Sequence, residues 1–219
     1  MADGPGGFIE TERKYDAAAG FALPDLAGLG GVAAVTRPQT YRLRAVYFDT
    51  ADFRLATAKI TLRRRTGGTD AGWHLKLPAG VDSRREVHAP LGRGASSVPA
   101  RLAGLVAGSS GGQPLQPIAL LATTRRVRRL AGRDGEVLAE VADDLVVGSL
   151  PAAAAASTGG PGMPEWREAS RWREIEIELV TGSRELLDSA GEALRRAGAA
   201  PSAAASKLSR LLDSAPGAP

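Results

Sequence analysis

The sequence predicts an α+β protein built on a closed or nearly closed eight-stranded antiparallel β-barrel, with accessory helices packed outside. Three observations favour this class. Eight segments show the two-residue alternation of strands, whereas only four stretches have helical periodicity. In most of the eight, one face is charged and the other is apolar. If the apolar faces lie outward under helices, the charged faces must line the lumen of the barrel.

The eight expected strands are bounded by clusters of Gly, Pro, Asp and Ser. In order they cover residues 8–15, 41–49, 59–66, 72–78, 84–91, 122–130, 136–147 and 172–180.

Four stretches are expected to be helical. The first, 22–30, contains a proline. The second, 97–108, has Ser97 as N-cap, and the third, 183–198, has Ser183 as N-cap and Gly198 as terminator. The fourth covers residues 202–215.

The domain organisation follows from segments that lack periodicity. We expect a disordered tail over residues 1–7, one domain over 8–213 and a tail or linker over 214–219. The small-residue stretch 151–164 is expected to be a flexible insert in that domain, and residues 108–117 a connector.

Composition limits the function classes. Among 219 residues there are no cysteines and only two histidines, which excludes thiolate sites and three-histidine metal sites. Any metal is therefore expected to be held mainly by oxygen. Neither a signal peptide nor a membrane span of about 18 apolar residues is present, so we expect a cytoplasmic protein that does not enter a membrane.

The charges separate by strand. Arg63 and Arg65 share a face opposite Leu62, and Glu174, Glu176 and Glu178 alternate with apolar residues in the last strand. An ordinary sheet with a solvated outer face would explain any single strand. Acids, however, gather on the first, seventh and last strands and bases on the third, fourth and sixth. Bases suit a multiply charged anion and carboxylates suit divalent cations that bridge to it, which points to a metal-bound polyphosphate.

An ordered set of seven motifs carries a family resemblance. They are IETERKYD, VYFDT, ITLRRR, HLKLP, RREV, EIEIEL and SKLSRLL. Together, from Phe8 to about Leu212, they resemble the CYTH domains, or triphosphate tunnel metalloenzymes, which include class IV adenylyl cyclases, thiamine triphosphatases and inorganic triphosphatases. The chain departs from the pattern at Lys59, where relatives often have Gly.

The resemblance implies roles for particular residues, with Mg²⁺ or Mn²⁺ as cofactor. Lys14 would position the attacked or leaving phosphate or assist proton transfer, and it forms the catalytic group with Glu10 and Glu12. The metal ligands implied are Glu10, Glu12, Glu176 and Glu178, with Glu174, Glu140 and Asp144 supporting them or completing a second site. The phosphate-binding residues implied are Arg63, Arg65, Lys76, Arg84, Arg125 and Lys207.

Three functions remain open at this point. The first is a metal-dependent phosphohydrolase acting on tripolyphosphate or another triphosphate. The second is a non-catalytic module that binds inorganic polyphosphate, which would suit the CHAD domain that often follows CYTH domains. The third is a class IV-type adenylyl cyclase, for which no adenine-binding motif is apparent.

The basic segment near residue 125, His74 and the three tryptophans are interpreted as parts of the fold rather than of the site. TTRRVRRLAGR is basic, but few aromatic residues surround it for base stacking, so nucleic acid is not an expected partner. His74 is expected to be a hydrogen-bonded scaffold residue. Trp73, Trp166 and Trp172 are expected to pack on the outer face of the barrel.

Overall fold

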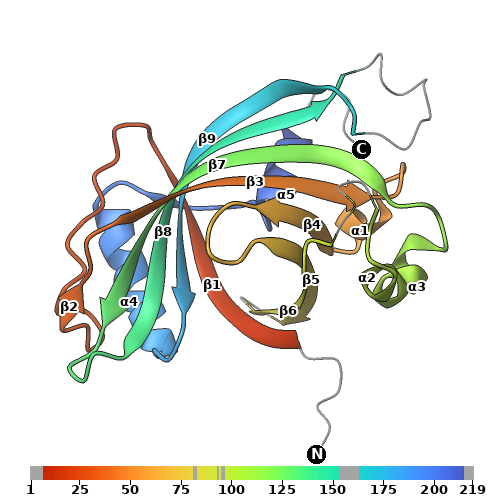
Figure 1. The fold of residues 1–219 in the computed structure, drawn as a ribbon. Helices are drawn as coiled ribbons and strands as arrows, with labels where there is room; N and C mark the ends of the chain where they lie inside the picture. Colours follow the sequence, from red (N-terminus) through yellow and green to blue (C-terminus); the bar gives the residue numbers. More distant parts are fainter. Residues whose placement is uncertain (1–6, 81–82, 93, 95–96, 153–162, 215–219) are drawn as a thin grey trace, which may run out of the picture.

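The computed structural model describes residues 7–80, 83–92, 94, 97–152 and 163–214 (Figure 1). Its strands are β1 (Gly7–Ala17), β2 (Ala34–Val35), β3 (Gln39–Asp49), β4 (Thr61–Thr66), β5 (Gly72–Gly80), β6 (Ser83–Ala89), β7 (Gln116–Ala131), β8 (Val137–Pro151), β9 (Trp166–Leu179) and β10 (Ala200–Pro201). Its helices are α1 (Arg54–Thr57), α2 (Ala100–Leu105), α3 (Ala107–Ser110), α4 (Arg184–Arg196) and α5 (Lys207–Asp213).

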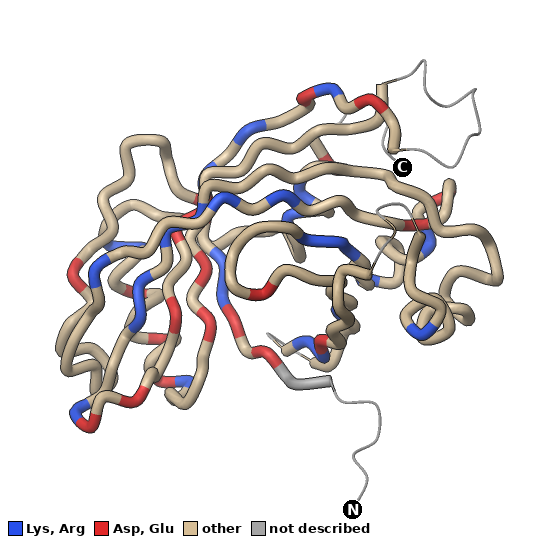
Figure 2. The backbone as a smooth tube through the Cα atoms, viewed as in Figure 1, with Lys and Arg blue, Asp and Glu red and all other residues tan. Residues whose placement is uncertain are grey.

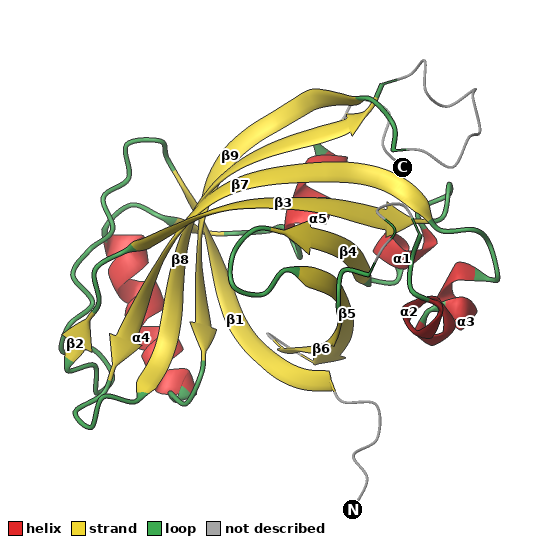
Figure 3. Ribbon diagram, in the orientation of Figure 1, coloured by secondary structure: helices red, strands yellow, loops and turns green. Residues whose placement is uncertain are grey.

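Eight antiparallel strands close into a barrel, which confirms the predicted fold class (Figure 3). The order around the ring is β1-β6-β5-β4-β3-β7-β8-β9, and β9 pairs again with β1. The N-terminal half of β1 pairs with β6, as in Glu10 opposite Arg84. Its C-terminal half pairs with β9, as in Glu12 opposite Glu178. A single strand thus brings the first acidic motif beside both the basic and the acidic parts of the ring.

One apolar core lies on the outer face of β1, β8 and β9, under α4. Tyr15, Ile175 and Ile177 contribute from the strands, and Leu187 and Leu194 from the helix. Because side chains alternate along a strand, burial of these residues outside directs their charged neighbours into the barrel.

A second outer core covers β4, β5 and β6. Leu62, Trp73, Leu75 and Val87 pack there with Leu102 of α2. Trp73 therefore packs on the outer face, as expected.

A third core lies inside one end of the barrel, where α5 packs against the inner face. Leu208 and Leu211 of α5 contact a cluster that includes Tyr47, Leu121 and Trp172. Trp172 has the same strand parity as the inward-facing acids of β9, so its predicted outer-face position is wrong. The helix closes this end with apolar contacts and carries its own N-terminal residue toward the charged interior.

The YFDT motif has a structural role in this fold. Asp49 is buried, and its carboxylate accepts hydrogen bonds from the backbone N–H groups of Thr50, Leu55 and Ala56 at 2.7–2.8 Å. It thereby anchors the chain between β3 and α1.

Two helix predictions need correction. Residues 22–30 form an irregular segment that ends in turns rather than a helix, because Pro24 lacks an N–H donor and Gly28 and Gly30 have φ of 78° and 51°. Apolar residues of this segment, such as Leu26, nevertheless pack in the core under α4. The predicted helix with Ser97 as N-cap begins only at Ala100, after Pro99.

Other helix boundaries also differ from the predicted ones. The stretch 97–108 is interrupted at Val106 and continues as α3, and the predicted helix 202–215 begins at Lys207. Ser183 and Gly198 do flank α4, with Gly198 at φ 99°. Much of the predicted insert 151–164, of the tail 1–7 and of the tail 214–219 lies outside the described residues.

Lys59 does not belong to a strand, although the strand 59–66 was predicted to include it. It lies in the turn before β4 with φ 59°, a left-handed conformation that favours glycine. A glycine would adopt this conformation at a lower steric cost than Lys59 does. Within the described ranges, no helix is long and apolar enough to cross a membrane.

Candidate functional site: a charged tunnel

The charged inner faces surround a cavity of about 220 Å³ in the middle of the barrel. Figure 2 shows basic residues on β4 and acidic residues along β1, and both strands contribute side chains to the cavity lining. Of the residues implied by the motifs, those that line it are Glu10, Glu12, Lys14, Arg63, Arg65, Lys76, Arg84, Arg125, Glu140, Glu176, Glu178 and Lys207. Asp144 and Glu174 do not line it and lie behind Lys207.

The basic side of the cavity is formed by Arg63, Arg65 and Arg125. Arg63 donates to the hydroxyl of Tyr47 at 3.3 Å, and Arg65 pairs with Asp70. The Nε atoms of Arg63, Arg64 and Arg65 are nevertheless all buried without a hydrogen-bond partner among the described residues. Buried donors normally have partners, and of these three side chains only Arg63 and Arg65 line the cavity, where a bound acceptor could reach them.

Electrostatics support the same conclusion. Burial, followed by the neighbouring charges of Arg63 and Arg125, lowers the pKa of Arg65 to about 9. Like charges held this close together favour an anion between them.

Arg125 and Lys207 are held in place by carboxylates. Arg125 makes a bidentate pair with Asp144 at 2.8 and 2.6 Å and also donates to Glu176 at 2.6 Å. Lys207 contacts Asp144 at 3.0 Å, Glu176 at 2.8 Å and also Glu174. The oxygens of these three acids lie within 4.8 Å of one another, but in this structure the Lys207 ammonium occupies the space between them.

These contacts set the charge state of Lys207. Burial alone would lower the pKa of its ammonium, but the surrounding carboxylates raise it above its ordinary value. Asp144 and Glu174 are thus placed to support the bases.

The acidic side of the cavity is formed by Glu10, Glu12 and Glu178. Burial, a hydrogen bond with Glu86 and nearby carboxylates raise the pKa of Glu10 to about 8, although Lys76 acts in the opposite direction. Burial followed by neighbouring acids also raises the pKa of Glu178. This excess of negative charge, with oxygen donors only, fits a hard dication such as Mg²⁺ or Mn²⁺.

Two lysines lie between the two sides. Lys14 Nζ contacts Glu12 at 2.5 Å and Glu176 at 3.9 Å. Lys76 pairs with Glu10 and contacts Glu86 at 3.2 Å. Each ammonium is therefore within reach of a ligand that spans the cavity.

Two of the implied residues lie at the edges of the site. Glu140 pairs with Arg129 at 2.9 Å and its side chain is 38% exposed. Arg84 donates to the carbonyl of Ala205, in the loop before α5. Both line the central cavity, but each contacts a group other than the central bases and acids.

The charged space continues on both sides of the central cavity. A cavity of about 250 Å³ shares Arg65 and Arg125 with it, and one of about 350 Å³ shares Lys14 and Arg84. The lining residues thus connect three spaces along the barrel.

Sequence reasoning did not assign site roles to Tyr47, Asp70 or Glu86. Tyr47 pairs with Arg63 and Glu86 pairs with Lys76, so each lies on the same inner face as a residue already assigned to the site. The alternation along their strands could therefore have indicated both. Asp70 lies in a turn, and only the tertiary structure reveals its contact with Arg65.

A closed barrel with a basic and an acidic side around one central cavity defines a charged-tunnel protein. The sequence-family model of the CYTH domain matches residues 9–212. The chain therefore belongs to the CYTH domain family.

Two curated proteins are similar to this chain in sequence. Uncharacterized proteins MT2285 and Rv2226 of two Mycobacterium tuberculosis strains are each 45% identical over 215 residues. The alignment covers 95% of this chain but 41% of those proteins, so the chain spans about two fifths of their length.

Two solved structures share the fold. One, from Bacillus halodurans, was proposed to be an adenylate cyclase and has a TM-score of 0.60 at 19% identity, covering 94% of this chain and 98% of that one. The other, from Hippeastrum, was proposed to be an adenylyl cyclase and revealed a dominant triphosphatase activity; its TM-score is 0.52 at 16% identity, with coverage of 95% and 96%.

Proposed function

We propose that this chain is a metal-dependent phosphohydrolase that acts on tripolyphosphate or another triphosphate compound inside the barrel. One observation carries the proposal: the same cavity is lined by a group of basic residues and by a group of acidic residues. The basic group is Arg63, Arg65 and Arg125, and the acidic group includes Glu10 and Glu12. A phosphate chain offsets the first group and a divalent cation bound to that chain offsets the second.

The chain's own residues would hold and orient the substrate. Arg63 and Arg65 have unpaired Nε donors for phosphate oxygens, and Arg125 is fixed in orientation by Asp144. Lys14, beside Glu12, is placed to bind the phosphate nearest the acidic side or to move a proton there. Pre-oriented charges of this kind account for most of the catalysis in phosphoryl transfer.

Glu10, Glu12 and Glu178 would hold the metal, and Glu176 would join them on release from Lys207. A bound Mg²⁺ or Mn²⁺ would stabilise charge developing on the phosphate oxygens and activate water as a nucleophile.

Phosphate release tests this proposal. Wild-type protein is incubated with tripolyphosphate, ATP or long-chain polyphosphate, with Mg²⁺, with Mn²⁺ or with EDTA, and cyclic AMP is measured alongside. Release that needs metal and is lost in the Glu10→Gln, Glu12→Gln double variant, with circular dichroism unchanged, is the expected result. Cyclic AMP as the main product would instead identify a cyclase.

A second candidate function is the binding of inorganic polyphosphate without turnover. It is favoured by the two side cavities, which extend the charged lining beyond the length of a single central site. Tight binding of long-chain polyphosphate without phosphate release from any substrate would support this function over hydrolysis.

A further inference from the structure

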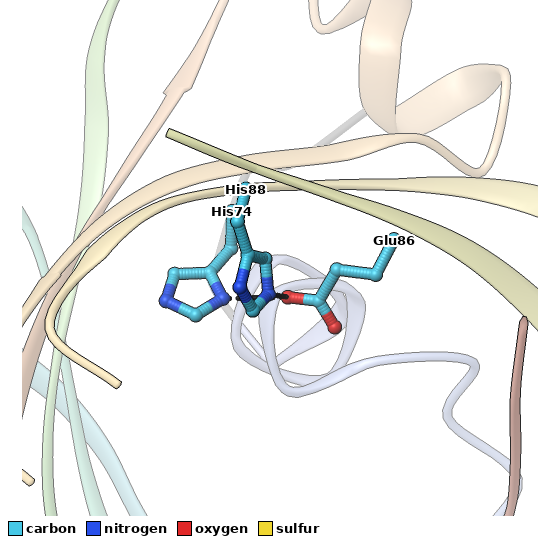
Figure 4. Close-up of side chains that lie close together, drawn as sticks. All are labelled: His74, Glu86 and His88. Atoms are coloured by element: carbon cyan, nitrogen blue, oxygen red, sulfur yellow. Dashed lines mark hydrogen bonds and ion pairs between the residues drawn. The ribbon is translucent and has the colours of Figure 1, made fainter. Parts of the chain in front are cut away.

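A cluster of two histidines and one glutamate lies in the wall of the tunnel, and the proposed hydrolysis assigns no role to its members. His74 of β5 is the direct cross-strand partner of His88 of β6, and Glu86 lies two residues from His88 on the same face. Figure 4 shows the two rings and the carboxylate converging on one point. The structure therefore gathers both histidines of the chain.

The contacts in this cluster are unusual for simple hydrogen bonding. His74 Nδ1 and His88 Nε2 lie 2.5 and 2.8 Å from the same oxygen, Oε1 of Glu86. The other ring nitrogen of His74, Nε2, lies 2.9 Å from the backbone carbonyl of Asp70. A carbonyl only accepts, so Nε2 must carry the proton, and a neutral His74 directs the Nδ1 lone pair at the carboxylate.

The neutral form of His74 is favoured. Burial lowers its pKa to about 4; the hydrogen bond with Glu86 acts in the opposite direction, and the charges of Arg63 and Arg65 act in the same direction as burial.

We propose that His74, His88 and Glu86 form a binding site for one transition-metal dication, with Zn²⁺ as the expected ion, beside the tunnel carboxylates. The three ligand atoms lie within 4.8 Å of one another. Two imidazoles and a carboxylate suit Zn²⁺ and related ions rather than Mg²⁺. A carbonyl that holds the second nitrogen of a histidine is the usual support of such a ligand.

Access and rigidity also suit a metal site. His74 and Glu86 are almost fully buried on paired strands, whereas the side chain of His88 is 41% exposed and opens the cluster to solvent. His88 and Glu86 also line the central cavity, which leaves room for water or phosphate as a further ligand.

Calorimetric titration of untagged protein with Zn²⁺, in excess Mg²⁺, tests the site. We expect one Zn²⁺ per chain in the wild type and in Glu12→Gln, and an affinity at least about tenfold lower in His88→Ala. Visible absorption of bound Co²⁺ should show the same dependence on His88. His74→Gln provides a second variant, and circular dichroism checks that each variant is folded.

Two results would overturn the proposal. Zn²⁺ affinity that survives in His88→Ala but disappears in Glu12→Gln would place the ion among the tunnel carboxylates. Absence of Zn²⁺ and Co²⁺ binding to folded wild-type protein would leave a hydrogen-bonded cluster only. Neither result depends on hydrolysis, so the test is independent of the proposed enzymatic function.

Discussion

Three consecutive arginines on β4 occupy different environments because side chains alternate along a strand. Arg63 and Arg65 line the central cavity, whereas Arg64 does not line it and pairs in register with Trp73 of the outer core. This alternation provides a matched comparison of equal charge changes on one strand.

Arg63→Ala and Arg65→Ala should each weaken tripolyphosphate binding, and Arg64→Ala should not. A charge-assisted hydrogen bond contributes about 1.5–3 kcal/mol, which corresponds to roughly a ten- to hundredfold loss in affinity. Calorimetry at low and high salt measures the effect, and the losses should shrink as salt screens the charges. Equal losses of affinity in Arg64→Ala and Arg65→Ala would show that the inner face of β4 is not the tripolyphosphate-binding surface.

The pKa of Glu10 predicts how stability depends on pH in the metal-free protein. Its folded-state pKa is raised from 4.5 to about 8. Between those values the folded chain holds a proton that the unfolded chain has lost, so the free energy of unfolding falls as pH rises.

Thermal unfolding in EDTA should therefore show Tm decreasing from about pH 5 to pH 8 in the wild type, with a smaller decrease in Glu10→Gln. Glu140→Gln, which changes an exposed carboxylate at the tunnel edge, is the control and should keep the wild-type slope. Mg²⁺ should raise Tm more at pH 8 than at pH 5. Identical slopes in wild type and Glu10→Gln would contradict the assigned pKa direction.

Asp144 is fully buried between Arg125 and Lys207, and its role differs from that of a surface carboxylate. Asp144→Asn should lower the free energy of unfolding by about 3–5 kcal/mol because it leaves buried cations without their partner. Glu140→Gln, on the same strand but in an exposed pair, should cost less than about 1 kcal/mol. Urea unfolding measures both, and similar small losses would refute the anchoring role of Asp144.

At the scale of elements, α5 joins the apolar core inside the barrel to the charged central cavity. Ser206 caps the helix by accepting from Ser209 N–H at 3.0 Å, and Lys207 follows directly. The Ser209 side chain accepts from Ser206 N–H in return, which completes a capping box.

Ser206→Ala should destabilise the protein by about 1 kcal/mol and weaken tripolyphosphate binding, because the cap fixes the start of the helix that carries Lys207. Ser183→Ala is the matched control, since Ser183 precedes α4 without a side-chain capping bond. It should affect neither property much. Denaturant unfolding measures the stability of both variants, and calorimetry measures their affinity for tripolyphosphate. Equal values for the two variants would contradict the role given to the Ser206 cap.

Local patterns predicted the strands well because alternation between charged and apolar residues is a local consequence of strand geometry. They also placed Glu10, Arg65 and Lys76 on inner faces, where the structure has them. The inward packing of Trp172 against α5 was not predictable in this way, since it depends on a helix distant in sequence.

The same limit explains the other errors. The segment 22–30 has apolar spacing resembling a helix, but the core under α4 holds it as an irregular segment that ends in turns. The pairing of His74 with His88 required the register of β5 and β6, which no local pattern provides.

At the scale of the whole molecule, barrel closure brings opposite charges together without neutralising them completely. β1 is the strand that joins the two sides, because it pairs with β6 and with β9. Arg65 retains a lowered pKa and Glu10 a raised one. The unliganded tunnel is therefore expected to be less stable than the tunnel filled by both an anion and a cation.

Ligand-induced stabilisation should thus be cooperative. Tripolyphosphate alone should raise Tm, Mg²⁺ alone should raise it less, and both together should raise it by more than the sum, because a cation held by Glu10 and Glu12 would attract the phosphate chain. Each ligand at a hundredfold excess over its Kd would add about 2.7 kcal/mol if the two bound independently. Differential scanning fluorimetry of wild type, Arg65→Ala and Arg64→Ala measures this coupling, with Arg64→Ala expected to match the wild type. Strictly additive shifts would mean that anion and metal bind separately, and the tunnel would not then be a site for a metal-bound phosphate chain.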